Sequence, residues 1–314
     1  MIDNVEEFYN AIGYNSNESV VFCYTYQCNI QCDHCCYNCG PHRTEKMDSE
    51  DAKRILKGVA SSGIRFVELL GGEPFLDSDT LSELLVYSSG LGLDVVVETN
   101  GFWGRTVETA KAVLSDLCVC GLKGILVSID TFHQKFIPLA YPLNVIRAAR
   151  ELGITNWINF SLSSDSEKDR TLLNDLKKET EHIFIINLFP YGRGASLQVI
   201  PDIWNCNLVI KSIVVNGDTF ACCGISDENK DVIDTPLYMG NCIRENPEEV
   251  LGRKNCLSMQ SFFDPNSPIW FKKILQQAPY KKMFENKQFS HMCGLCKEML
   301  HIEEISRKIM EFGN

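Results

Sequence analysis

Short apolar runs rich in β-branched residues alternate with longer segments of helical periodicity between about residues 19 and 190. This alternation is typical of βα units that assemble around a parallel sheet. We predict six strands with five intervening helices. The strands are predicted at residues 19–26, 64–70, 93–99, 124–130, 157–163 and 183–189.

The segment from Asp48 to Ser62 illustrates the helical pattern. Asp48 is a candidate N-cap, because an aspartate side chain accepts a hydrogen bond from a backbone N–H of the first turn. An apolar stripe follows, as expected of a helix that packs against a sheet. It consists of Ala52, Ile55, Leu56, Val59 and Ala60.

Six βα units are fewer than the eight of a complete barrel of this type, so we predict an α/β fold with an open, partial (β/α)6 barrel. In parallel βα sheets, ligands gather at the carboxyl ends of the strands, where loops and helix N-termini meet. Residues that directly follow the strands are therefore the first candidates for chemistry.

The pattern changes after Gly194. Residues 208–224 predict two strands joined at Asn216 and Gly217, since both residue types tolerate the positive φ of a tight hairpin turn. After this hairpin, regular secondary structure is harder to recognise. A final helix is predicted from the spacing of its apolar residues. Those residues are Met299, Ile302, Ile305 and Ile309.

The length of 314 residues suits one large barrel-like domain with a smaller appendage, or two ordinary domains. We therefore divide the chain into three parts. They are an N-terminal segment (residues 1–18), the partial barrel (19–195), and a small region of hairpin and helix (196–314).

Composition and charge narrow the function classes. Hydrophobic residues make up 45% and charged residues 23%, as in an ordinary globular protein. The net charge is −11 and the basic residues are scattered, which argues against nucleic acid as a partner. The first residues lack the features of a secretory signal, and no apolar run is long enough to span a bilayer. We predict a cytoplasmic protein without a membrane partner.

Cysteine is the unusual component, since five of the fifteen cysteines lie between Cys28 and Cys39. In a reducing compartment, clustered thiols point to metal or redox chemistry rather than to disulfides. Cys28, Cys32 and Cys35 are spaced so that one loop can wrap three thiolates around an iron-sulfur cube and leave one iron open. The alternative is zinc, with Cys32 and Cys35 pairing with Cys36 and Cys39 as two C-x-x-C units.

The next predicted strand ends in LLGGEPF, which places Gly71, Gly72 and Glu73 at the same sheet edge as the cysteines. The cysteine spacing, this GGE segment and the six-unit period together resemble the radical S-adenosylmethionine (SAM) superfamily. The resemblance covers roughly residues 19–195. It implies that the amino and carboxylate groups of SAM fill the open iron.

The same resemblance implies roles for individual residues. Cys28, Cys32 and Cys35 would ligate a 4Fe-4S cluster. Gly71, Gly72 and Glu73 would hold the methionine ammonium through backbone carbonyls and charge, glycine being suited to a close backbone approach.

Ser128 and Asp130, after the fourth predicted strand, would face the ribose of SAM by the same resemblance. The alternative for both is ordinary loop capping. His34 departs from the family pattern, since many members carry an aromatic residue there that packs over adenine.

A second set of cysteines lies in the C-terminal region: Cys206, Cys222, Cys293 and Cys296. Four thiolates are the count of a closed site, either a structural zinc or an iron-sulfur cluster. The segment from Cys206 to Cys222 resembles the auxiliary-cluster region of SPASM and twitch members of the superfamily, and the shorter twitch type, with one auxiliary 4Fe-4S cluster, fits better. Cys242 and Cys256 are unassigned, and either is an alternative to one of the four.

Cys223 follows the predicted ligand Cys222, and successive side chains of a strand point to opposite faces. Cys223 would therefore point away from the auxiliary cluster. Its thiol is a candidate donor of a hydrogen atom to a carbon radical, and the alternative is a small buried apolar residue.

The segments CDHCC, NGFWG, GDTFACCG and CGLC together resemble the radical SAM peptide epimerases that mature epipeptides. This resemblance implies conversion of an L residue to D in a ribosomally made precursor peptide, with Cys223 returning the hydrogen. It also implies a flavodoxin- or ferredoxin-type reductant. The alternatives are a radical SAM dehydrogenase or thioether-forming maturase that uses the auxiliary cluster as electron acceptor, and a non-enzymatic zinc scaffold.

Overall fold

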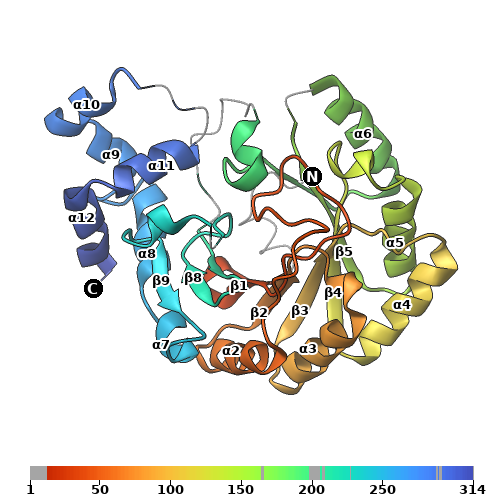
Figure 1. The fold of residues 1–314 in the computed structure, drawn as a ribbon. Coiled ribbons are helices and arrows are strands. Elements are labelled where there is room, and N and C mark those ends of the chain that lie inside the picture. The colour runs from red at the N-terminus through yellow and green to blue at the C-terminus, as the bar shows by residue number, and fades with distance from the viewer. Residues whose placement is uncertain are drawn as a thin grey trace.

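The computed structural model of the chain describes residues 13–163, 166–197, 206, 209–226, 228–287, 289 and 292–313 (Figure 1). Six parallel strands form the inner layer of the fold. They are β1 (Ser19–Cys23), β2 (Phe66–Leu70), β3 (Asp94–Thr99), β4 (Leu122–Ser128), β5 (Thr155–Ser161) and β6 (Ile183–Ile186).

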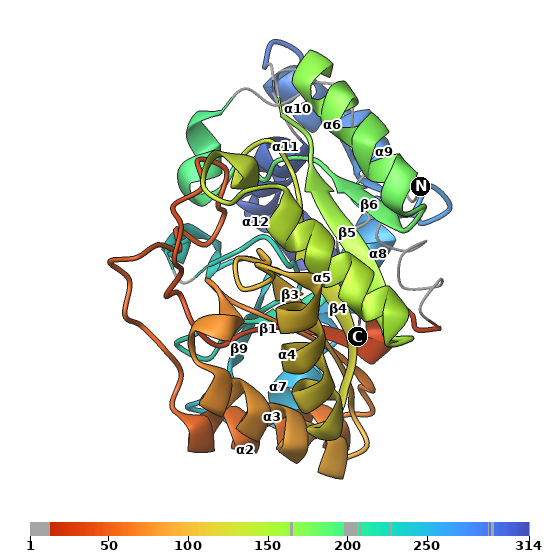
Figure 2. The ribbon, with the colours of Figure 1, turned by 90° about the vertical axis from the view of Figure 1, so that its right-hand side faces the viewer.

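Each strand is connected to the next through a helix. The five helices are α2 (Ser49–Ser61), α3 (Ser78–Gly90), α4 (Val107–Val119), α5 (Ala140–Glu151) and α6 (Ser166–Glu179). Figures 1 and 2 show these helices on the outer side of the curved sheet. The predicted α/β fold with a partial (β/α)6 barrel is confirmed.

The strands lie side by side in chain order, each parallel to its neighbour from β1 to β6. β1 ends earlier than predicted, because Tyr26 donates its N–H to the carbonyl of Glu45 rather than to a neighbouring strand. All five β1 residues are buried, and Figure 1 shows β1 inside the ring of helices.

The predicted hairpin forms and also extends the barrel sheet. β7 (Lys211–Ile213) pairs in parallel with β1, and β8 (Asp218–Phe220) returns antiparallel to β7. Gly217 adopts a φ of +84° in the turn, and the Asn216 side chain accepts the N–H of Asp218. A third strand that was not predicted, β9 (Tyr238–Asn241), completes a nine-stranded sheet within the described chain.

Short helices cover the β7–β9 end of the sheet. They are α7 (Pro247–Leu251), α8 (Asn255–Phe263), α9 (Phe271–Leu275), α10 (Ala278–Phe284), α11 (Met292–Leu300) and α12 (Glu303–Gly313). The single final helix that the spacing predicts is two helices. The chain turns at His301, whose ring hydrogen-bonds to the carbonyl of Asp231, and α12 then packs against α8.

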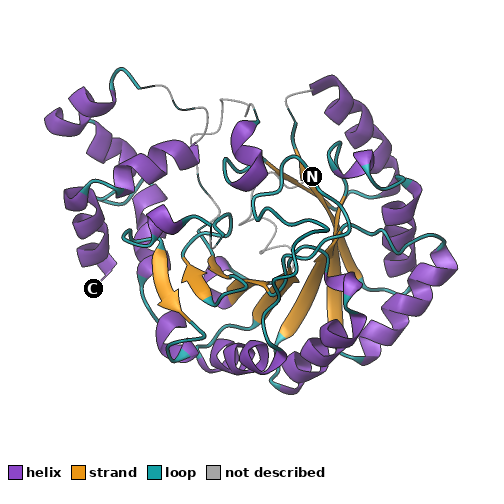
Figure 3. Cartoon of the chain, viewed as in Figure 1, coloured by secondary structure: helices purple, strands orange, loops and turns teal. Residues whose placement is uncertain are grey.

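The division of the chain into segments 1–18, 19–195 and 196–314 stays a prediction. Residues 1–12 and most of 198–208 lie outside the described residues. In Figure 3 the strands of the barrel and of the C-terminal region belong to one continuous inner layer. Within the described residues, no helix combines the length and apolar character needed to cross a membrane.

The helix α2 begins as the sequence predicts. Asp48 is its N-cap, and the carboxylate accepts the N–H of Glu50 at 2.9 Å. The α2 residues Ala52, Ile55 and Val59 are buried, whereas Ala60 is only half-buried. The apolar stripe is therefore slightly narrower than predicted.

We expect Asp48→Ala to lower the free energy of unfolding by about 1 kcal/mol, because the first turn of α2 loses its side-chain acceptor. Urea denaturation of the full chain measures the difference. Asp48→Asn keeps an acceptor oxygen and should stay near the wild type. Equal stability of the alanine variant and the wild type would contradict this role of the cap.

Candidate functional site

The loop between β1 and α2 carries the five clustered cysteines. Its base is closed by backbone hydrogen bonds between its two sides, in which Cys28 donates to Gly40 at 3.2 Å and Gly40 donates to Tyr26 at 3.3 Å. Cys28, Cys32 and Cys39 are buried. The loop is thus a closed structure at the carboxyl end of β1.

A cavity at the carboxyl ends of the strands brings together most of the predicted site residues. Its lining includes Cys28, Cys32, Cys35, Gly71, Gly72, Ser128 and Cys223. Cys36 and Cys39, the additional thiols of the zinc alternative, also line it. Glu73 and Asp130 are not among its lining residues.

The spacing of the thiols bears on the choice between zinc and an iron-sulfur cube. Among the described residues, the only group of three or more potential ligands whose atoms all lie within 4.8 Å of one another is His34, Asp130 and His133. All fifteen cysteines are described, and no three sulfurs are that compact. Around one zinc, sulfurs stand roughly 3.8 Å apart, since Zn–S is about 2.3 Å. Among the described residues, the thiols are thus not arranged as a preformed zinc site.

The GGE segment is held against the start of the cysteine loop by backbone contacts. Gly72 donates its N–H to Thr25 at 2.7 Å, and Glu73 donates to Gln27 at 2.8 Å. A Cβ on Gly71 would lie 2.5 Å from the Thr25 oxygen, and one on Gly72 would lie 2.0 Å from the Gln27 oxygen. Both glycines are therefore required by the chain's own backbone, before any ligand is considered.

The Glu73 carboxylate faces the protein interior. It accepts the Thr99 hydroxyl and the Asn100 N–H, each at 2.8 Å, and its residue is 1% exposed. Burial raises the pKa of Glu73 to about 7, and the hydrogen bonds from Asn100 and Thr99 oppose that shift. The Asn100 amide in turn donates to the side chain of Asn29 at 2.9 Å. The carboxylate thus connects the ends of β2 and β3 to the cysteine loop.

Ser128 and Asp130 have different surroundings. Ser128 lines the cavity and donates to the Glu98 carboxylate at 2.9 Å. Asp130 is fully buried and accepts the backbone N–H groups of Phe132 and His133. Burial disfavours its ionisation, but His133 and His34 hold the pKa of Asp130 below its usual range. The contacts of Asp130 are the loop-capping contacts of the alternative interpretation, whereas Ser128 bonds to a carboxylate of β3. The ribose role of both residues stays a prediction.

His34, the departure from the family pattern, lines the cavity with its ring stacked on Phe132 at 4.5 Å between centroids. Burial lowers the pKa of His34 to about 4, and nearby Asp130 only partly opposes this. The ring is therefore neutral at neutral pH. A neutral imidazole can present a flat aromatic face to a ligand.

The four C-terminal cysteines converge although they come from distant segments. Cys206, Cys222, Cys293 and Cys296 all line a second cavity, together with Tyr191 and apolar side chains such as Met259. Cys206 precedes β7, Cys222 follows β8, and the other two lie on α11. Burial raises the pKa of Cys222 to about 11. The protein therefore holds this thiol in its neutral form unless a cation replaces the proton.

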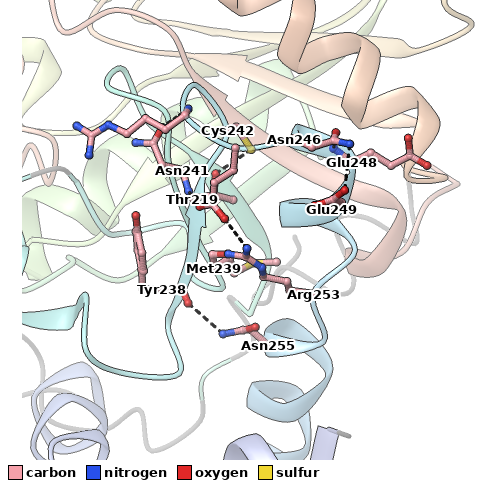
Figure 4. A network of polar contacts seen from close by, with 12 residues as sticks. Thr219, Tyr238, Met239, Asn241, Cys242, Asn246, Glu248, Glu249, Arg253 and Asn255 are labelled. Carbon is pink, nitrogen blue, oxygen red and sulfur yellow. Dashed lines mark hydrogen bonds and ion pairs between the residues drawn. The ribbon is translucent and has the colours of Figure 1, made fainter.

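The two unassigned cysteines lie elsewhere. Cys242 is fully buried and accepts the Thr219 hydroxyl at 3.1 Å, within a polar network around β9 (Figure 4). Cys256 lies against the Met239 sulfur at 3.9 Å. Neither residue is among the lining of the second cavity. The choice of the four ligands stays a prediction.

Adjacent residues Cys222 and Cys223 line different cavities, as the sequence predicts, but for another reason. β8 ends at Phe220, and the two cysteines lie in a bend and a turn rather than on a strand. The Tyr37 hydroxyl donates to the Cys223 carbonyl, which ties this turn to the cysteine loop.

Several residues around the first cavity were not recognised in the sequence. Glu98, held by Ser128 and by Asn159 at 2.7 Å, contributes a carboxylate to its wall. Tyr37, within the cysteine loop, donates to the Cys223 carbonyl. Arg193 donates to the Cys32 carbonyl of that loop. The sequence offers a signal only for Arg193, which is flanked by two glycines directly after a predicted strand.

Residues 22–178 match the family described as the radical SAM superfamily. The chain belongs to the radical SAM superfamily. This membership implies a 4Fe-4S cluster and SAM as cofactors of a radical SAM enzyme. Three cysteines of one loop line the same cavity, and thiolates are the ligands that such a cluster takes.

This radical SAM enzyme is similar to YydG of Bacillus subtilis (strain 168), a protein named for peptide biosynthesis. The two are 22% identical over 296 residues, which cover 88% of this chain and 90% of YydG. Against several other curated radical enzymes the match spans about half of their length.

Two solved structures show the same fold. The anSMEcpe structure with bound AdoMet and Cp18Cys peptide has a TM-score of 0.55 at 11% identity, covering 94% of this chain and 98% of that chain. SuiB of Streptococcus suis, bound to the precursor peptide SuiA, has a TM-score of 0.53 at 14% identity, covering 81% of this chain and 65% of that chain.

We expect Gly72→Ala to destabilise the radical SAM enzyme by about 1–3 kcal/mol, as overpacking does, because its Cβ would overlap the Gln27 carbonyl. The backbone movement that relieves this overlap should also displace the cysteine loop and lower the iron content per chain. Urea denaturation and iron quantification measure both effects.

Gly90→Ala is the matched control, since a Cβ there would meet no heavy atom within 4 Å. It should leave the free energy of unfolding and the iron content unchanged. A Gly72→Ala variant with wild-type values in both measurements would show that the backbone contact is not a constraint.

Proposed function

We propose that this radical SAM enzyme inverts one residue of a ribosomally made peptide from L to D. The observation that carries the proposal is that Cys223 lines the same cavity as Cys28, Cys32 and Cys35. A hydrogen donor in that cavity is available to a substrate radical formed there.

The proposed ligands of the 4Fe-4S cluster are Cys28, Cys32 and Cys35. When bound, the cluster and SAM supply the 5′-deoxyadenosyl radical that removes a hydrogen atom. The backbone of Gly71 and Gly72 and the hydroxyl of Ser128 lie on the cavity wall, where they would bind SAM. Glu73 would act indirectly, by holding the GGE backbone in place.

The position of Cys223 in the first cavity suggests how the peptide residue would be inverted. Removal of the Cα hydrogen leaves a planar carbon radical on the peptide. Cys223 then donates its S–H hydrogen to the opposite face, which forms the new C–H bond and leaves a thiyl radical. One electron from the reductant and one proton restore the thiol. The buried walls of the cavity would exclude water from this exchange.

A precursor peptide is the proposed substrate. YydG carries a name from peptide biosynthesis, and the titles of the SuiB and anSMEcpe structures name bound peptides. The wall of the first cavity offers the Glu98 carboxylate and the Asn159 side chain, groups suited to the amides of an extended peptide. A flavodoxin- or ferredoxin-type protein is the proposed reductant.

The second cavity is the proposed site of an auxiliary 4Fe-4S cluster held by Cys206, Cys222, Cys293 and Cys296. Their convergence on one enclosed space supports this assignment, since four thiolates are the ligand count of a closed site. Because Cys222 adjoins Cys223, this cluster would lie close enough to deliver the restoring electron.

The same proximity favours a second candidate function. An auxiliary cluster next to the substrate cavity can also accept an electron from the substrate radical. In that case the enzyme would be a radical SAM dehydrogenase or a thioether-forming maturase. The product would then lose two hydrogens rather than change its stereochemistry.

We expect turnover in deuterated water to place one deuterium at a single Cα of the peptide, because the Cys223 thiol exchanges with solvent. Mass spectrometry of the product measures the label. A product lighter by two hydrogens, without deuterium, would instead support the second candidate function.

The variant Cys223→Ala should still form 5′-deoxyadenosine but no D product. Cys118→Ala is the control, since that thiol is exposed and belongs to α4 on the outside of the barrel. Normal epimerisation by Cys223→Ala would remove this residue from the mechanism.

We expect about eight irons per chain after anaerobic reconstitution, which corresponds to two cubes, and about four if only the first site is filled. Quantification of iron, sulfide and zinc measures this. The variant Cys293→Ala should lose the iron and sulfide of the auxiliary cluster and retain those of the SAM-binding cluster. Zinc in place of iron at either site would contradict the corresponding assignment.

A further inference from the structure

The segment after β6 lies against the cysteine loop, although more than 150 residues separate them in the chain. Arg193 donates from Nε to the Cys32 carbonyl at 2.8 Å and from Nη2 to the Cys39 carbonyl at 2.6 Å. Its backbone N–H donates to the Cys35 carbonyl at 3.1 Å. One residue therefore binds the loop at three points.

The glycines on both sides of Arg193 make this contact possible. Gly192 has a φ of +53°, and a Cβ there would lie 2.5 Å from the carbonyl oxygens of both Cys35 and Cys36. A Cβ on Gly194 would lie 2.5 Å from the Phe189 oxygen and 2.9 Å from the His34 oxygen. The Gly-Arg-Gly backbone is packed directly on the loop backbone, where no larger residue fits.

The chemistry of the contact suits an arginine. A guanidinium has several N–H donors in a rigid plane, so it can satisfy two carbonyls that lie in different directions. Its charge strengthens both hydrogen bonds. Because Arg193 also lines the first cavity, this positive charge lies beside the thiols that would carry negative charge as ligands.

We propose that Arg193 is a positioning residue that holds the Cys28–Cys39 loop in the shape that receives the cluster, and that its charge favours cluster reduction. Hydrogen bonds and charges around the ligands set both the affinity and the potential of such sites. The inference rests on the proposed ligands Cys28, Cys32 and Cys35, but not on the peptide reaction.

The same segment reaches the second cavity. Tyr191, two residues before Arg193, is buried and lines the space between the four C-terminal cysteines. A local effect of Arg193 must therefore be separated from a general loosening of both sites. Under the proposed ligand sets, only the cluster of the first site would have an open iron for SAM, so added SAM would identify its spectroscopic signal.

The test uses the reconstituted full chain without peptide, as wild type, Arg193→Gln and Arg193→Lys. Two quantities are measured: the rate at which an iron chelator removes each cluster, and the reduction potential of the cluster whose electron paramagnetic resonance signal changes with SAM. Arg43→Gln is the matched control, because Arg43 lies on the same connection between β1 and α2, is not among the lining residues of the first cavity, and pairs with Glu45 and Glu228.

We expect Arg193→Gln to lose the SAM-responsive cluster roughly 10-fold faster than the wild type, with a more negative potential and an unchanged auxiliary signal. Arg193→Lys should keep a near-wild-type potential, because the charge remains. It should still lose the cluster faster than the wild type, because one ammonium cannot reproduce the two hydrogen bonds that the guanidinium donates to the Cys32 and Cys39 carbonyls. Arg43→Gln should match the wild type.

Wild-type rates and potential in Arg193→Gln would overturn the proposal. Equal acceleration at both clusters would also overturn it, since that result marks a general structural role. If Arg193→Gln does not fold, the lysine variant decides, and a wild-type rate of cluster loss in it overturns the proposal. A wild type without any SAM-responsive signal would refute the ligand assignment itself, and this inference with it.

Discussion

The contact between the backbones that follow β1 and β2 is the constraint on which the rest of the site depends. Gly72 and Glu73 donate to Thr25 and Gln27, so the GGE segment lies against the residues that lead into Cys28. Any side chain on Gly71 or Gly72 would occupy the space of a main-chain oxygen. The distance between the cysteines and the GGE backbone is therefore set by the chain itself, at the edge where parallel strands end.

Two further contacts complete the frame around the cysteine loop. Glu73 and Asn100 connect it to the end of β3, and Arg193 connects it to the segment after β6. One contact comes from the middle of the barrel sheet and the other from the segment after its last strand. Because the donors and acceptors are buried or partly buried, each would be costly to leave unpaired. The loop thus has a defined shape without help from a regular secondary structure.

The adjacent residues Cys222 and Cys223 line the second and the first cavity, respectively. Parallel pairing of β7 with β1 brings this turn to the mouth of the barrel, and α11 then supplies Cys293 and Cys296 from the other side. The C-terminal region is therefore an extension of the barrel sheet that contributes to the wall of the first cavity. This arrangement accounts for the proximity of the Cys223 thiol, the first cavity and the second set of cysteines.

The sequence by itself determined the six strands and five helices, because periodicity, capping and turn signals are local, as at Asp48 and Asn216. It also indicated that Cys28, Cys32 and Cys35 share one loop at a strand end, because their spacing is local, but it left Cys36, Cys39, Cys242 and Cys256 as alternatives. Only the tertiary structure decided that Glu73 and Asp130 face protein donors, that Cys242 and Cys256 lie outside the second cavity, and that Arg193 reaches the loop. Those outcomes depend on contacts between residues far apart in the chain, for which a local pattern carries no signal.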